Sequence, residues 1–137
     1  MADNFLLEIV TPYRKLLSKE VEELTAPGAE GEFGVLSGHT PFLTVLKPGE
    51  LSFKKGSELG HIAVSRGYAE VLPDKTTILV DSAEFAEEID LEASKELLSK
   101  SEEALKRLNQ DDPEYSSTAA SYDMAEARLR VKEKQRG

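Results

Sequence analysis

The 137-residue sequence contains no cysteine, which excludes disulfide bonds, thiolate nucleophiles and cysteine-ligated metals. It contains only two histidines, His39 and His61, and neither has a second ligand at a metal-motif spacing. We therefore expect no metal site. We interpret His39 as a turn residue that bonds nearby backbone, and His61 as an edge or face residue of a strand.

Long hydrophobic runs are also missing, since no run approaches the roughly 20 residues of a membrane-spanning helix. Residues 1–4 lack the basic start and apolar core of a secretory signal. Positive charge is scarce: 17 basic against 26 acidic residues give a formal net charge of −9. A phosphate backbone repels such a surface. We expect a cytoplasmic protein that neither inserts into a membrane nor binds nucleic acid.

Groups that would form an active site are absent as well. The sequence shows no nucleophile paired with a base and no Walker-type lysine loop. Acidic pairs such as Glu22-Glu23 and Glu102-Glu103 lie in polar runs typical of solvated faces. We predict that the chain is not an enzyme and holds no cofactor; an independent small hydrolase or metal enzyme is the disfavoured alternative.

Short apolar runs do fill the chain from Asn4 to about Asp81, separated by turn residues, which is the pattern of strands. The turns occur at intervals that suit hairpins. The pattern predicts an antiparallel β-sandwich over residues 1–86. The expected strands are 5–10, 21–26, 42–46, 51–54, 61–64, 68–72 and 76–80, and the expected turns are 26–28, 47–49, 55–57 and 73–75.

The segment from Glu30 to Pro41 combines glycines, acids and a histidine between apolar residues. Gly31, Gly34 and Gly38 lack a Cβ, so the backbone there can adopt positive φ or approach a neighbour closely. The segment is either an ordered loop between strands or a shaped docking surface. The residues alone favour the loop.

The composition changes after Asp81, where glycine disappears until Gly137 and the helix-forming residues Ala, Glu, Lys and Leu dominate. Asp90 is the expected N-cap of a first helix. That helix would carry an apolar stripe on one face. The stripe consists of Leu91, Leu97, Leu98, Ala104, Leu105 and Leu108.

A second helix is expected from Asp112 as N-cap and Pro113 as first helical residue. The short connection predicts an antiparallel two-helix hairpin over residues 87–137, and hence an α+β fold. Each helix has few large apolar residues, so the hairpin could exchange its packing interface for another protein at little net cost. The second helix would present Tyr115, Ala119, Tyr122 and Leu129 on one side and Ala120, Met124, Ala127 and Val131 on the next.

Three blocks of sequence carry a resemblance to a known family. Residues 5–12 read FLLEIVTP, residues 30–44 read EGEFGVLSGHTPFLT, and residues 65–71 read SRGYAEV. In this order, followed by a helical hairpin, they closely resemble the bacterial epsilon subunit of the F-type ATP synthase. The resemblance covers essentially the whole chain.

The resemblance implies a non-catalytic central-stalk (rotor) subunit of the proton-translocating enzyme, peripheral on the cytoplasmic face of the bacterial membrane. Residues 1–86 would bind the gamma subunit and the c-ring, and residues 87–137 would be regulatory. The hairpin would extend toward the alpha and beta subunits and inhibit ATP hydrolysis.

The same resemblance assigns roles to individual residues. The family's acidic contact with the c-ring loops falls on Glu32, with Gly31, Phe33, His39 and Thr40 in the same region. Basic residues that meet acidic segments of the catalytic head in this family would be Arg128, Arg130, Lys132 and Lys134.

Some family members also bind ATP between the sandwich and the hairpin, through an Ile-Asp-x-x-Arg-Ala motif. Here Asp90 is kept, and Lys100 and Arg128 match further positions, but Ala93 stands where the motif has arginine. That change removes a bidentate phosphate donor, so ATP binding is expected to be weak or absent. A free-standing ATP-binding sensor domain is the alternative function, and saturable stabilisation by nucleotide would reveal it.

Overall fold

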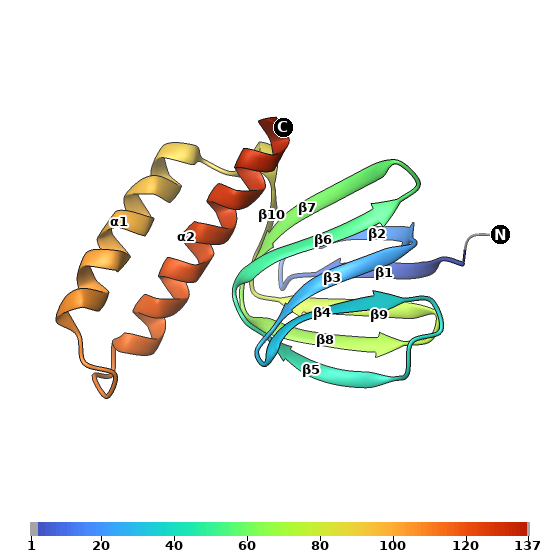
Figure 1. Cartoon of the computed structure of the whole chain (residues 1–137), viewed down its shortest axis with the longest axis horizontal. Helices are drawn as coiled ribbons and strands as arrows, with labels where there is room; N and C mark the ends of the chain where they lie inside the picture. Colours follow the sequence, from blue (N-terminus) through green and yellow to red (C-terminus); the bar gives the residue numbers. More distant parts are fainter. Residues whose placement is uncertain (1–2, 137) are drawn as a thin grey trace.

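A computed structural model describes residues 3–136 and places the strands before two long helices (Figure 1). The expected α+β fold is confirmed. A single 3₁₀ turn, η1 (Ala86–Glu88), joins the two parts, and α1 (Leu91–Arg107) and α2 (Tyr115–Arg136) follow it. The strands are β1 (Phe5–Val10), β2 (Lys15–Val21), β3 (Glu23–Gly28), β4 (Gly31–Leu36), β5 (Phe42–Leu46), β6 (Gly49–Lys55), β7 (Glu58–Val64), β8 (Gly67–Leu72), β9 (Lys75–Val80) and β10 (Ala83–Phe85).

The strands form one continuous hydrogen-bonded sheet in the order β10-β7-β6-β3-β5-β8-β9-β1-β2, with β4 paired to β3. This sheet folds over on itself as a sandwich, so that both halves face one core (Figure 1). Strand pairing is antiparallel except between β1 and β9, which are parallel. The expectation of a purely antiparallel sandwich is wrong for this pair. Because seven strands separate β1 from β9 in the chain, no tight turn forces them to be antiparallel.

The core follows from the alternation of side chains along the strands. In β1, Phe5, Leu7 and Ile9 are each at most 1% exposed, while the residues between them are half-buried. Equivalent positions on the other strands complete one apolar cluster. Its largest fully buried members include Leu24, Val35, Leu46, Leu51, Ile62, Val71 and Ile78.

The glycine-rich segment is not simply a loop, because its first half is strand β4. Gly31–Leu36 pairs with β3 along its whole length, and a two-residue turn at 29–30 joins the two strands. The turn that the sequence predicted at 26–28 therefore lies two to three residues later. Gly31 adopts φ +134, which other residues rarely do. The glycines hid the strand because backbone pairing, and not side-chain propensity, holds it.

Strand β2 was also missed, and the predicted strand 21–26 is in fact two strands with a break at Glu22. Only Val21 of β2 is buried. The charged side chains of Lys15, Lys19 and Glu20 obscure the apolar alternation, as is usual for a strand at the edge of a sheet.

The helical hairpin agrees with the expectation in its main features. The Asp90 side chain accepts a hydrogen bond from the Ala93 N–H at 3.0 Å, which confirms the predicted N-cap of α1. The predicted start of the second helix is wrong by two residues, because α2 begins at Tyr115. Asp112 instead closes the connecting turn, where its carboxylate accepts from the Asn109 N–H at 2.8 Å.

The leucine stripe of α1 is only half-buried, and the fully buried residues of this helix are Ser94 and Ser101. Their hydroxyls donate to the Asp90 and Leu97 carbonyls of their own helix. A small side chain with a satisfied hydroxyl allows close packing, so α1 and α2 meet through small residues.

Helix α2 lies between α1 and the sandwich, and it alone of the two helices packs on the sheet (Figure 1). The contact is a small apolar cluster separate from the main core. We call it the docking seam, and it consists of Ala63 from β7, Ile89 from the η1–α1 connection, and Met124, Ala127 and Val131 from α2.

Candidate functional site

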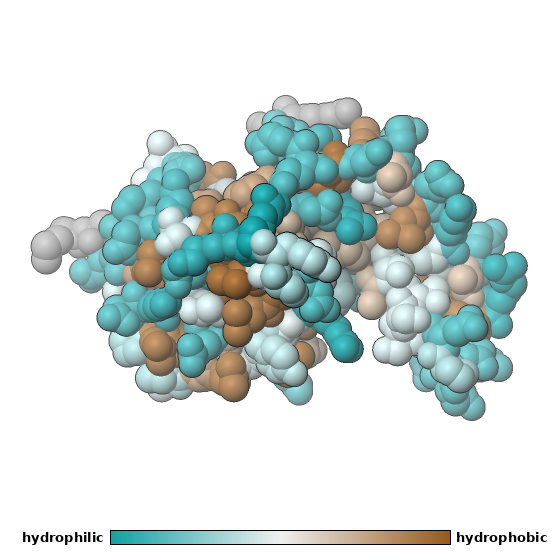
Figure 2. All heavy atoms as spheres, turned by 180° about the vertical axis from the view of Figure 1, so that it is seen from behind, coloured by the Kyte–Doolittle hydropathy of each residue, from teal (hydrophilic) through white to brown (hydrophobic). Residues whose placement is uncertain are grey.

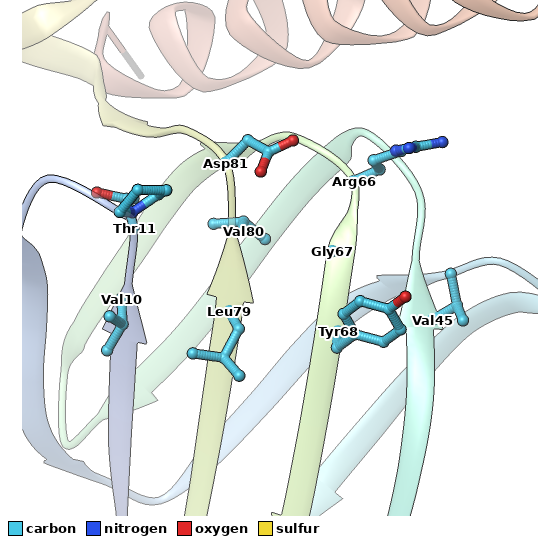
Figure 3. A pocket seen from close by; sticks show the side chains of 10 residues that line it. Val10, Thr11, Val45, Arg66, Gly67, Tyr68, Leu79, Val80 and Asp81 are labelled. Atoms are coloured by element: carbon cyan, nitrogen blue, oxygen red, sulfur yellow. The ribbon is translucent and has the colours of Figure 1, made fainter.

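The most distinctive surface of the sandwich is a row of apolar side chains that the sequence did not reveal. Val10, Leu79, Tyr68 and Val45 stand opposite one another on the adjacent strands β1, β9, β8 and β5. Figure 3 shows them side by side across the four strands. Tyr68 is 55% exposed, Val45 48% and Leu79 47%. We call these four residues the apolar row; exposed contiguous apolar surface of this kind is typical of protein interfaces.

The apolar row borders a groove of about 560 Å³. Gly67 lines the groove, and a Cβ at this position would lie 2.0 Å from the Leu79 carbonyl oxygen. Arg66 and Asp81 lie at the end of the groove nearest the hairpin (Figure 3). Viewed from behind, hydrophobic side chains gather on the sandwich, whereas the hairpin is mainly hydrophilic (Figure 2). The sandwich therefore offers an apolar face with a charged border.

The residues assigned to the c-ring side lie on β4 and just beyond it. Phe33 and His39 both contact the Phe42 ring, with centroid distances of 5.4 and 5.0 Å. The His39 Nδ1 donates to the Thr40 carbonyl at 2.7 Å, which confirms that His39 bonds nearby backbone. The Phe42 ring thus brings Phe33 and His39 together, with Thr40 beside His39, whereas Gly31 and Glu32 form the start of β4.

Glu32 is exposed and points away from Phe33, since successive side chains of a strand alternate. It lines a small polar cleft of about 230 Å³ with residues of α2 that include Asp123 and Arg130. Burial raises the pKa of the Asp123 carboxyl. The role of Glu32 and its neighbours in binding the c-ring stays a prediction.

The four basic residues assigned to the catalytic head lie on α2, and three of them are bonded to the sandwich or to η1. Arg128 Nε donates to Glu84 Oε1 at 2.6 Å. Lys134 Nζ donates to both carboxylate oxygens of Glu50 at 2.7 and 2.8 Å. Lys132 Nζ donates to the Ala86 carbonyl at 2.9 Å.

Arg130 differs from these three residues. Its one ion pair within the described residues runs along its own helix, to Glu126 at 3.5 Å. The structure therefore shows the hairpin folded against the sandwich, with Arg128, Lys132 and Lys134 engaged and Arg130 turned to its own helix.

The residues assigned to ATP binding do not converge. A cleft of about 420 Å³ lies between the sandwich and the hairpin, and Arg128 lines it together with Arg66, whereas Asp90 and Lys100 do not. Asp90 caps α1, and Lys100 pairs with Glu96 at 2.9 Å on the same helix. Weak or absent ATP binding stays a prediction, and the sensor domain stays the alternative function.

His61 lies on β7, as expected for a strand residue, and its Nδ1 is 2.9 Å from Glu50 Oε2 at an angle that does not make a hydrogen bond. Among residues 3–136 there is no group of three or more side chains that could hold a metal ion. No helix within this part of the chain is long and apolar enough to cross a membrane.

Known proteins resemble this chain in sequence and in structure. Residues 4–86 match the family model described as ATP synthase, Delta/Epsilon chain, beta-sandwich domain. The ATP synthase epsilon chain of Geotalea daltonii is 53% identical over 131 residues, which cover 96% of this chain and 95% of the relative. That of Geobacter sulfurreducens is 50% identical over the same shares.

Two solved assemblies contain chains of the same fold. A chain of the Euglena gracilis mitochondrial ATP synthase, from a structure of OSCP, F1 and c-ring, matches with TM-score 0.78 and 25% identity, covering 93% of this chain and 80% of that one. A chain of the Tetrahymena thermophila central stalk and c-ring matches with TM-score 0.62 and 20% identity, covering 97% and 96%. With half of its residues shared with bacterial relatives over nearly the full length of both chains, this protein belongs to the ATP synthase epsilon-chain family.

Proposed function

We propose that the chain is a non-catalytic rotor subunit of the central stalk of a proton-translocating ATP synthase, without an active site of its own. It would link the catalytic head to the c-ring at the cytoplasmic face of the bacterial membrane, as a peripheral protein. The observation that carries this proposal is the apolar row, an exposed face on a rigid sheet where a partner can dock.

The apolar row is proposed to dock on the gamma subunit. Its four side chains come from four paired strands, so the sheet fixes their spacing and little ordering is needed on binding. Tyr68 at its centre combines a large apolar ring with a hydroxyl, a combination that is enriched at interfaces. Arg66 and Asp81 at the border supply charge that can fix the orientation of the partner.

The c-ring is proposed to bind at Glu32, with Gly31, Phe33, His39 and Thr40 around it. Glu32 is exposed near the start of β4, directly after Gly31, whose positive φ follows the turn between β3 and β4. Residues 1–86 would then form the docking domain and residues 87–137 the regulatory domain.

The hairpin is proposed to act as a brake on ATP hydrolysis. It packs on the sandwich through the small docking seam and a few polar bonds. Because so little apolar surface holds it, the hairpin can leave the sandwich and extend toward the alpha and beta subunits. Arg128, Arg130, Lys132 and Lys134 would then meet acidic segments of the catalytic head.

A binding measurement tests the docking proposal. Tyr68→Asp places a charge in the centre of the apolar row, where docking would bury it, so affinity for the isolated gamma subunit should fall at least about tenfold. Leu59→Asp is the matched control, because Leu59 is 66% exposed and lies outside the row. Equal affinities of the two variants, both folded by circular dichroism, would place the gamma contact elsewhere.

A further inference from the structure

Two acidic residues of the sandwich hold two basic residues of α2, Arg128 and Lys134. Glu84 lies on β10 and Glu50 on β6, and both carboxylates are poorly exposed, with 26% and 13% of the side chain accessible. Ion pairs with restricted access to water are screened less than fully exposed ones. The two bonds therefore hold α2 in place in addition to the docking seam.

The geometry points to a function for these two acids: we propose that Glu50 and Glu84 are positioning residues that set the strength of the brake. They occupy Arg128 and Lys134, which the extended hairpin would need for the catalytic head. This inference rests on the proposed function of the hairpin. The closed and the extended states compete for the same two cations. Removing the charge of Glu50 or Glu84 therefore favours the extended state.

Arg130 shows that the assignment is specific to particular residues of α2. It lies between Arg128 and Lys132 in sequence, yet within residues 3–136 its one ion pair is to Glu126 of the same helix. Arg130 can therefore contribute to the extended state without breaking an ion pair to the sandwich within residues 3–136. Arg128 and Lys134 must first leave Glu84 and Glu50.

The docking seam does not supply this competition. Met124, Ala127 and Val131 are apolar and lose contact with Ala63 and Ile89 whenever the hairpin leaves. The free energy of their burial opposes extension and does not depend on what the hairpin then binds. The cations of the ion pairs, in contrast, can form equivalent pairs with an acidic partner, so only the ion pairs are replaced in the extended state.

The first experiment measures the hairpin position in the isolated full-length chain. The sequence has no cysteine, so cysteines introduced at Ser57 and Gln110, both exposed, accept spin labels that report the distance from the sandwich to the hairpin tip. Glu50→Gln and Glu84→Gln should each raise the extended fraction roughly two- to fivefold, and the double variant should raise it more than either.

The control is Glu58→Gln, which removes a sandwich ion pair of similar length, to Lys19 at 2.8 Å, without touching the hairpin. It should leave the distance distribution unchanged. If the double variant at Glu50 and Glu84 gave the same distribution as Glu58→Gln, the assignment would be overturned.

The second experiment uses the assembled ATP synthase and a charge swap. Glu84→Gln should strengthen inhibition of hydrolysis. Glu84→Arg combined with Arg128→Glu restores the closed pair but puts an acid toward the acidic head, so inhibition should fall below that of the wild type. A merely structural pair would give equal inhibition in the swap and the wild type, and that result would contradict the inference.

The two experiments separate this inference from the brake itself. Suppose that Glu84→Gln opens the hairpin but that hydrolysis is changed neither by Glu84→Gln, nor by the charge swap, nor by removal of residues 87–137. The proposed brake is then wrong, while the role of the two acids in holding the hairpin closed stands. If removal of those residues relieves inhibition but the glutamine variants leave the hairpin closed, the brake holds and the role of Glu50 and Glu84 is refuted.

Discussion

Gly67 shows how a missing side chain shapes the candidate interface. A Cβ at this position would lie 2.0 Å from the Leu79 carbonyl oxygen and 2.9 Å from the Val80 Cα, both backbone atoms of the paired strand β9. Backbone cannot swing aside as a side chain can, so strands β8 and β9 would have to separate locally. Gly67 thus lets the two central strands of the apolar row lie close together.

Gly67→Ala should destabilise the protein by about 1–3 kcal/mol, as expected for overpacking against backbone. Urea unfolding followed by circular dichroism measures the change. Gly34→Ala is the control, since its Cβ would meet nothing nearer than the Leu24 carbonyl oxygen at 3.8 Å; its unfolding free energy should stay within about 0.5 kcal/mol of the wild type. Equal losses in the two variants would contradict this explanation.

Glu8 forms the centre of a charged group on the outer face of β1. Its carboxylate lies 2.9 Å from Lys15 Nζ and 2.9 Å from Lys75 Nζ, on the strands either side. A hydrogen bond from Lys15, the larger cause, and one from Lys75 lower the pKa of Glu8 from 4.5 to about 2. The folded state therefore binds this proton less readily than the unfolded chain.

Because the pKa of Glu8 is lower in the folded state, its contribution to stability is complete above about pH 4.5 and is lost as the pH falls toward 2. Glu8→Gln should make the unfolding free energy less dependent on pH in this interval. The stability difference from the wild type should shrink on acidification and vanish only below about pH 2, the folded-state pKa. Glu20→Gln, on the neighbouring edge strand, serves as the control; a constant difference across the interval would contradict the assignment.

Residues whose roles depend on close neighbours in the chain could be predicted from the sequence. Asp90 caps a helix through Ala93, three residues away, and His39 bonds the carbonyl of Thr40. The partners of Arg128 and Lys134 could not be predicted, because Glu84 and Glu50 are 44 and 84 residues distant. Only the folded chain brings such pairs together.

At the scale of elements, strands with clear alternation were predicted and strands without it were not. β1 alternates buried and half-buried residues and was found. β4 contains two glycines and buries only Val35, so its sequence shows no alternation of apolar and polar residues that would predict a strand. β2 is an edge strand whose charges face solvent. Both missed strands are held by backbone hydrogen bonds to neighbours that periodicity cannot identify.

The hairpin is joined to the sandwich by a small apolar contact, the docking seam. Met124 is 7% exposed and is the largest side chain that α2 contributes to the docking seam. Truncating a buried methionine removes its apolar contacts and leaves a cavity. We therefore expect Met124 to govern how firmly α2 stays on β6 and β7.

Met124→Ala should weaken docking of the hairpin by about 2–3 kcal/mol, while the sandwich keeps its stability. Hydrogen exchange measures both at once: amides of α2 should exchange faster and amides of β7 should not change. Met124→Leu keeps the volume and should behave nearly as the wild type. Faster exchange throughout the sandwich in Met124→Ala would show that the two parts unfold together.

At the scale of the whole molecule, the apolar row is assembled from strands that begin 5, 42, 67 and 75 residues into the chain. No local pattern in the sequence predicts it, because each strand contributes only one exposed or half-buried apolar side chain, which would be ordinary alone. The family could nevertheless be identified from sequence, since the order and spacing of several blocks identify it without knowledge of strand pairing.

The molecule combines a rigid sheet with a lightly held pair of helices. The sandwich has a continuous apolar core, whereas the hairpin contacts the sandwich through the small docking seam and a few polar bonds. Such a division suits the proposed function, in which the sandwich would transmit force and the hairpin would change position. Docking and regulation can then be altered separately.

The most direct test of this account measures ATP hydrolysis by the assembled synthase with the full chain and with residues 89–137 removed. The described strands and their core lie wholly within the part that remains, so the truncated chain should still bind gamma and support ATP synthesis. We expect hydrolysis to rise when the hairpin is absent. Unchanged hydrolysis in a truncated complex that assembles normally would contradict the account.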